Sequence, residues 1–322
     1  GYWQGEVDFA SIDVRIDGSL PIEIARFDDV FENSFETQGV FDPKMDLFKW
    51  SRTADGWEKT DLAPVKEEIR TSGGANTFFL VHGLWNSQDS MTSIARHLST
   101  HNNLLIYAID YGWIRGIETQ GAAFAEILRE CVPNNEKVNI IAHSMGGLVS
   151  RSAIELDGGD ANVQKVLTLG TPHQGVPANI VADYEVNFFD TRTRLPLFGV
   201  PTVANISAQV RNLNETSEFM DKMDKKKKPN LVYYAFLAGD SNRDYKPSRV
   251  TTNAYVWVDN DGLVSVPSAL RLRADSNKQP NYRQTFSLNH EELRLDSMVM
   301  AEIDELFGLL ENDQYDGKIV GR

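Results

Sequence analysis

The sequence predicts an α/β fold, in which a mostly parallel sheet is flanked by helices. Six apolar runs of strand length follow one another from residue 77 onward, and longer segments with helical spacing separate several of them. Parallel strands that are covered on both faces have nearly continuous apolar sequences, whereas half-exposed strands alternate. The chain has 322 residues, 41% of them hydrophobic, which is enough for one large domain and a smaller addition.

Residues 1–73 are predicted to form a β-rich N-terminal region. "IDVRID" and "LPIEIA" alternate apolar and polar residues on either side of "DGS", which predicts a hairpin. "LFKWSRT" and "WEKT" predict a second hairpin around Asp55 and Gly56, and "TSGGAN" has the composition of a linker. We therefore expect the catalytic domain to occupy residues 74–311, with a C-terminal tail at 312–322.

The strands of this larger domain are predicted in "TFFLVHG", "NLLIYAID", "VNIIAHS", "VLTLGTP", "LVYYAFLAG" and "RQTFSLNH". Helices are expected at 90–99, 119–131 and 291–310, where apolar residues recur at helical spacing. The last helix is predicted to present one apolar face, made of Leu295, Met298, Val299, Ile303, Leu306 and Leu310. This alternation of strands and helices is typical of a parallel sheet.

The segment 176–230 separates two predicted strands by more chain than a connection between strands needs. Its apolar residues include Phe188 and Phe189, which are the predicted substrate-binding residues of a cap or lid insertion. The alternative is that the segment forms a second small core.

The stretch "VNIIAHSMGGLVSR" predicts a strand, a sharp turn at Ser144 and a helix. Ala142 and Gly146, two residues before and two after the serine, are small enough for such a turn. The pattern differs from Gly-x-Ser-x-Gly by the one methyl group of Ala142. A serine that stands clear on this turn is a candidate nucleophile, and the alternative is a glycine-rich turn without chemistry.

A serine nucleophile needs a histidine base, an acid that orients the imidazole, and donors for the oxyanion. Ligands of a parallel sheet bind beyond the carboxyl ends of its strands, so the partners are sought there. Of the six histidines, His290 directly follows the last predicted strand and is the predicted base. His82 and His173 lie in tight loops suited to shaping the site, and the side chain of His143 is expected to point away from the turn.

Three aspartates, Asp240, Asp259 and Asp261, satisfy the chain order of serine, acid and histidine. Asp261 is favoured because it precedes a glycine and an apolar run, and the alternative is that "DNDG" is merely an Asx turn. The oxyanion donors are predicted to be the backbone N–H groups of Leu84 and Met145. His97 and His101, in or just after the first helix, are expected to be ordinary surface or core residues.

Four motifs in this order, "LVHGLW", "IIAHSMGGLVSR", "LGTPHQG" and "DNDGLVSVPSAL…NH", resemble an α/β-hydrolase of the lipase and esterase kind over residues 77–311. The resemblance implies a Ser144–Asp261–His290 triad and hydrolysis of carboxylic esters through an acyl-serine intermediate. Acyl transfer or amide hydrolysis by the same triad is the alternative. A non-catalytic binding module is the alternative from another class.

Composition restricts the partners of the chain. Asp and Glu total 46 against 32 Lys and Arg, and the resulting net charge of −14 disfavours nucleic acid. No apolar run is long enough to predict a transmembrane segment, and we expect a small-molecule or lipid ester as substrate, with transient contact to a lipid interface. No motif for a metal, a dinucleotide or calcium is found, so no cofactor is expected. The compartment is left open, with secreted and periplasmic locations both permitted.

Overall fold

The structure is a computed structural model that describes residues 45–84, 86–112, 115–178, 208–226, 229, 231–241, 258–272 and 279–309. The hairpin predicted in the first 25 residues, the predicted substrate-binding residues Phe188 and Phe189, and the C-terminal tail lie outside the described residues. The described strands form one sheet of eight, in the order β2-β1-β4-β3-β5-β6-β7-β8.

The strands are β1 (Asp46–Ser51), β2 (Gly56–Lys59), β3 (Thr77–Val81), β4 (Leu105–Asp110), β5 (Val138–His143), β6 (Val163–Leu169), β7 (Tyr233–Gly239) and β8 (Tyr282–Phe286). The α-helices are α2 (Leu62–Ser72), α3 (Thr92–Leu98), α4 (Ile117–Cys131), α5 (Met145–Glu155), α8 (Glu218–Lys225), α10 (Val266–Leu270) and α11 (Ser297–Phe307). Short 3₁₀ helices lie at η1 (Gly74–Asn76), η2 (Gln88–Met91), η3 (Gly159–Ala161) and η5 (Glu292–Arg294).

All pairs among β3 to β8 are parallel, and β1 pairs antiparallel with both β2 and β4. The predicted mostly parallel sheet is therefore confirmed, and so is the second predicted hairpin, in which Trp50 lies opposite Trp57. Residues 45–72, which the sequence analysis grouped with the N-terminal region, contribute β1, β2 and α2 to this sheet and its core.

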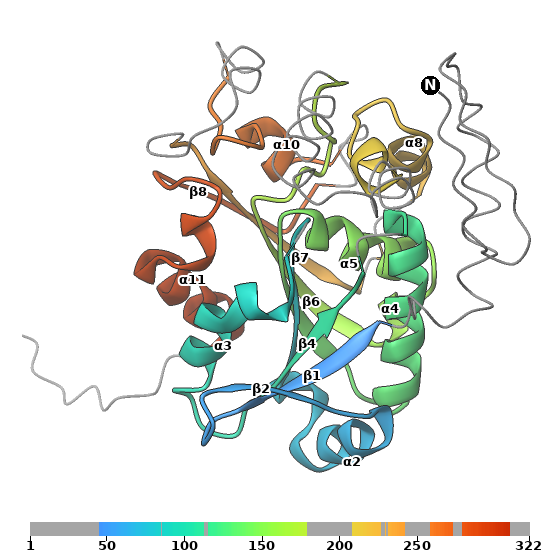
Figure 1. The fold of residues 1–322 in the computed structure, drawn as a ribbon, viewed down its shortest axis with the longest axis vertical. Helices are drawn as coiled ribbons and strands as arrows, with labels where there is room; N and C mark the ends of the chain where they lie inside the picture. Colours follow the sequence, from blue (N-terminus) through green and yellow to red (C-terminus); the bar gives the residue numbers. More distant parts are fainter. Residues whose placement is uncertain are drawn as a thin grey trace, which may run out of the picture.

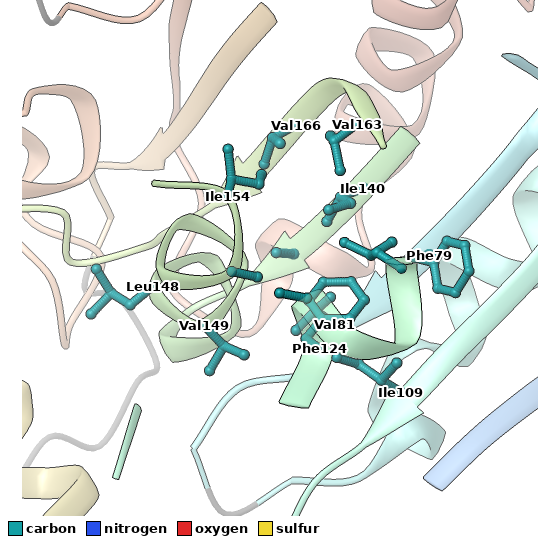
Figure 2. Close-up of a cluster of buried hydrophobic side chains, with 14 of the residues drawn as sticks. Phe79, Val81, Ile109, Phe124, Ile140, Leu148, Val149, Ile154, Val163 and Val166 are labelled. Atoms are coloured by element: carbon teal, nitrogen blue, oxygen red, sulfur yellow. The ribbon is translucent and has the colours of Figure 1, made fainter. Parts of the chain in front are cut away.

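Helices cover both faces of the sheet, with α2, α4 and α5 on one side and α3 and α11 on the other (Figure 1). Alternate residues of β3 supply the two cores: Phe79 and Val81 pack under α4 and α5, whereas Phe78 and Leu80 pack under α3 and α11. Figure 2 shows the first of these cores between the sheet and its helices. Burial on both faces explains why the strand sequences are apolar at nearly every position.

The C-terminal helical segment differs from the prediction of one helix over 291–310. It consists of η5 followed by α11, because the Asp296 side chain caps α11 by accepting a hydrogen bond from the backbone N–H of Met298 at 2.7 Å. The prediction that Leu295 and Met298 share the buried face is wrong, since they are 52% and 61% exposed. Val299 and Ile303 are buried as predicted.

The first residue of the predicted cap segment 176–230 lies beside a later residue of the same segment. Val176 and Asn214 form an isolated parallel bridge, in which the Val176 N–H donates to the Leu213 carbonyl at 2.8 Å and the Glu215 N–H donates to the Val176 carbonyl at 3.0 Å. Residues 208–226 of the predicted cap segment belong to the described fold, and Val210, Leu213 and Phe219 are buried in the same core as α4 and α5. Among the described helices, none has the length and apolar character needed to cross a membrane.

Candidate active site

Ser144 occupies the turn between β5 and α5 with φ 55° and ψ −130°, a conformation that is rare for a residue with a side chain. Its N–H donates to the Leu169 carbonyl at 2.9 Å, and the Thr171 hydroxyl donates to the Ser144 carbonyl at 2.8 Å. Glycine is needed at position 146, where a Cβ atom would lie 2.3 Å from the His82 carbonyl oxygen. Close packing and hydrogen bonds to the next strand end therefore hold the turn.

Asp261 and His290 form a buried pair. Asp261 Oδ2 lies 2.7 Å from His290 Nδ1, and both side chains are at most 2% exposed. The second carboxylate oxygen, Oδ1, accepts the backbone N–H groups of Leu263 at 3.0 Å and Val264 at 2.7 Å. The His290 N–H also donates to the Asp261 carbonyl at 2.9 Å. Side chain and backbone thus fix the imidazole to one aspartate.

The other two aspartates that the chain order permitted lie elsewhere. Both Asp240 and Asp259 are exposed. The Asp240 backbone N–H donates to the Phe286 carbonyl at 3.0 Å, which continues the pairing of β7 with β8. Among the three candidates, Asp261 is the one that the structure brings to His290.

The environment sets the charge and tautomer of His290. Burial alone would lower the pKa of His290, but the charge of Asp261 and its hydrogen bond outweigh burial, so the pKa is raised above its usual value. Because an ionised Asp261 can accept hydrogen bonds but cannot donate them, Nδ1 carries the proton of the neutral imidazole. The lone pair then lies on Nε2, which is the atom a general base requires.

The backbone around His290 is fixed from two sides. The Asn289 N–H donates to Glu292 Oε2 at 2.8 Å and the Glu292 N–H donates to Asn289 Oδ1 at 3.0 Å, which is a reciprocal cap of the turn that carries His290. His143 Nε2 donates to the His290 carbonyl at 2.9 Å. Burial, followed by the charge of His290, holds the pKa of His143 well below its usual value, so His143 is a neutral support.

Two glycines at strand ends make room for the Asp261–His290 pair. Gly170, which follows β6, has φ +59°, and a Cβ atom there would lie 3.0 Å from Asp261 Oδ2 and 3.1 Å from His290 Nδ1. At Gly239, the last residue of β7, a Cβ atom would lie 2.9 Å from Asp261 Cβ. Neither glycine has a role that the sequence predicts, although each directly follows an apolar strand run.

The two predicted oxyanion donors lie in segments that flank Ser144. Met145 is the first residue of α5, a position whose N–H has no acceptor within the helix. Leu84 lies in the loop after β3, where a Cβ atom on the preceding Gly83 would come within 2.9 Å of Ser144 Cβ. His82 Nδ1 donates to the Gly83 carbonyl at 2.8 Å, so this histidine shapes the loop as the sequence analysis expected.

His173 contributes to packing below the site. Its Nε2 lies 2.9 Å from the Thr168 hydroxyl, and its ring stacks on Phe236 with 3.8 Å between the centroids. Burial and the nearby charge of Arg151 hold the pKa of His173 well below its usual value. His173 is therefore a neutral residue of the interior.

Residues 72–196 match the family described as PGAP1-like alpha/beta domain. The structure is similar to that of the Bacillus licheniformis lipase BlEst2 in its mature form, with a TM-score of 0.54 and 20% identity over 72% of this chain and 91% of that one. The propeptide form gives 0.56 and 21% over 75% of this chain and 52% of that one. Among curated proteins, the comparison finds no match. The chain has the α/β-hydrolase fold, as its motifs predicted.

Proposed function

We propose that this protein hydrolyses carboxylic esters through an acyl-serine intermediate, with Ser144 as nucleophile, His290 as general base and Asp261 as orienting acid. The observation that carries the proposal is the buried 2.7 Å contact between Asp261 and His290, at the sheet edge that also carries the strained Ser144 turn. The lipase description of the Bacillus licheniformis protein supports ester hydrolysis as the class of reaction. The substrate is a small-molecule or lipid ester.

Acylation begins when Ser144 Oγ bonds to the ester carbonyl carbon while His290 Nε2 takes the hydroxyl proton. The electron pair of the carbonyl double bond moves to oxygen, and the backbone N–H groups of Leu84 and Met145 donate to the oxyanion. Collapse of this intermediate breaks the bond to the alcohol oxygen, which leaves with the proton held by His290. The acyl group remains on Ser144.

Deacylation repeats these steps with water. His290 Nε2 takes a proton from water as the water oxygen bonds to the acyl carbon, and then returns the proton to Ser144 Oγ as the carboxylic acid departs. Asp261 stays ionised and stabilises the imidazolium in both halves. The raised pKa of His290 fits this role, because it measures how strongly the carboxylate favours the protonated ring.

A fluorophosphonate probe tests the proposal. The probe is expected to attach to Ser144, identified by mass spectrometry of the labelled peptide, and to abolish ester hydrolysis. Ser144→Ala should lose both labelling and hydrolysis. The matched control is Ser99→Ala, since Ser99 is half-buried at the end of α3 and its hydroxyl donates to the carbonyl of Arg96 at 2.7 Å. Label on another serine, or normal ester turnover by Ser144→Ala, would refute the assignment.

A further inference from the structure

Two histidines and an aspartate converge at the end of the sheet face covered by α3 and α11. His97 Nε2 lies 2.8 Å and His101 Nε2 lies 2.9 Å from the same oxygen, Asp304 Oδ1. The three ligand atoms lie within 4.8 Å of one another. The side chains are half-buried, with exposed fractions of 23%, 16% and 13%. We call these residues the His–Asp–His cluster.

We propose that the His–Asp–His cluster is a structural zinc site, separate from the proposed catalytic residues. Two imidazole nitrogens and a carboxylate oxygen are a ligand set that Zn²⁺ favours, and a water molecule would complete a tetrahedron. Bonds of about 2.0–2.1 Å place neighbouring tetrahedral ligands about 3.3 Å apart. The observed 2.8 and 2.9 Å separations from Asp304 Oδ1 therefore need to widen by about half an ångström, and the two imidazole nitrogens, which lie within 4.8 Å of each other, need to settle at about 3.3 Å.

The backbone holds the two histidines in register. His97 lies in the last turn of α3, and the chain continues to turn because the Thr100 N–H donates to the His97 carbonyl at 3.0 Å and the His101 N–H donates to the Leu98 carbonyl at 3.1 Å. Arg52 also donates to the His101 carbonyl from the turn after β1. The spacing of four residues thus places both rings on one side of the chain.

Two helix ends and one carboxylate contribute negative charge at the cluster, and Arg52 and Lys165 already donate to the nearby carbonyls of His101 and Leu306. The cluster lies where the C-terminal ends of α3 and α11 meet (Figure 1), and carbonyl groups give such ends a partial negative charge. Asp304 adds a full negative charge in the last turn of α11, where an acidic side chain is unfavourable on its own. A divalent ion bound by Asp304 converts this repulsion into attraction.

Zinc at this position would join two helices that flank the candidate active site in the chain. α3 follows the loop that carries Leu84, and α11 follows the turn that carries His290. The segments that precede these two helices also touch, since Arg294 Nη1 of η5 donates to the Ser90 carbonyl of η2 at 2.6 Å. We therefore expect zinc to stabilise the fold without taking part in ester hydrolysis.

The test is metal binding and unfolding of the full chain after removal of metal with a chelator. Titration with Zn²⁺ should show a single strong site by calorimetry. At free zinc of about 100 times Kd, the unfolding equilibrium constant should fall about 100-fold, which raises Tm. Substitution by Co²⁺ should give the visible absorption of a four-coordinate ion. No zinc binding, or no effect of zinc on Tm, would overturn the proposal.

Two variants assign the binding to these ligands. Asp304→Asn keeps an oxygen that accepts both imidazole hydrogen bonds, and His101→Gln keeps an N–H donor, but each should remove the zinc-dependent rise in Tm and the Co²⁺ spectrum. Asp55→Asn, which alters an exposed aspartate paired with Arg96 of the same helix, should keep both. If either ligand variant lowers Tm equally with and without zinc, or if both keep the zinc response, the cluster is only a hydrogen-bonded contact.

Discussion

Gly170→Ala tests how closely the Asp261–His290 pair is confined. The backbone at Gly170 has φ +59°, and the added methyl group would meet Asp261 Oδ2, His290 Nδ1 and Leu293 Cδ1 at 3.0 to 3.1 Å. Gly158→Ala is a matched control, because Gly158 has φ +77° but has no atom within 4 Å of the new methyl group. The two substitutions therefore share a backbone cost and differ in crowding.

The expected magnitudes follow from these contacts. A left-handed conformation costs an alanine about 1–2 kcal/mol, and the loss of unfolded-state freedom offsets about 0.4–1 kcal/mol of it. Gly158→Ala should thus lower the free energy of unfolding by about 1 kcal/mol. Crowding adds about 1–3 kcal/mol for Gly170→Ala. Displacing a catalytic group by 1 Å lowers the rate about 100-fold. A shift of a few tenths of an ångström should therefore lower kcat about tenfold, which corresponds to about 1.4 kcal/mol in activation free energy.

The assay combines denaturant unfolding with turnover of a short-chain ester at a temperature where both variants are folded. Gly158→Ala should keep the kcat of the parent protein, whereas Gly170→Ala should lose about tenfold in kcat with a smaller change in KM. Equal kcat for the two variants would refute the reasoning, since it would show that the methyl group does not disturb the imidazole and carboxylate.

Two further outcomes are expected for the Asp261–His290 pair. Asp261→Asn should lower kcat by about 10⁴-fold. The amide oxygen must accept from the two backbone N–H donors, so the NH₂ group faces Nδ1 and the ring proton moves to Nε2. Asp240→Asn should change kcat little, and the opposite ranking of the two variants would contradict the assignment. The raised pKa of His290 predicts that kcat/KM falls as pH drops through a value above 6.5, because the protonated imidazole cannot act as a base. The stability that the protonated pair contributes is complete below pH 6.5 and is lost as pH rises through the raised pKa. A midpoint of the kcat/KM profile below pH 6.5 would contradict this.

The strands could be predicted from sequence because burial on both faces leaves an unbroken apolar run, as in "TFFLV" of β3. The last helix could not, because helical spacing alone does not show where a cap interrupts it. The capping residues Asn289, Glu292 and Asp296 were present in the sequence. Asn289 and Glu292 orient the turn of His290, and Asp296 marks the start of α11. Recognising Asn-x-x-Glu and the later aspartate would therefore have corrected the predicted start of the last helix.

For the candidate site, chain order left three aspartates open, and only the folded strand ends distinguish Asp261. Gly170 has no signal in sequence beyond its place after a strand, because its requirement comes from two side chains more than 90 residues away. The His–Asp–His cluster was missed for the same reason. His97 and His101 have a ligand-like spacing, but Asp304 lies 203 residues beyond His101 in the chain.

The bridge between Val176 and Asn214 ties two distant parts of the chain together through two backbone hydrogen bonds. The residues just before Asn214 also belong to the main fold. Val210 and Leu213 are buried in its core, and Asn212 Oδ1 accepts a backbone N–H at the start of α4 at 2.9 Å. A laboratory exchange of the chain between Val176 and Asn214 must therefore keep these residues, because a replacement without them would leave a gap in the core and remove a hydrogen-bond acceptor from the first turn of α4.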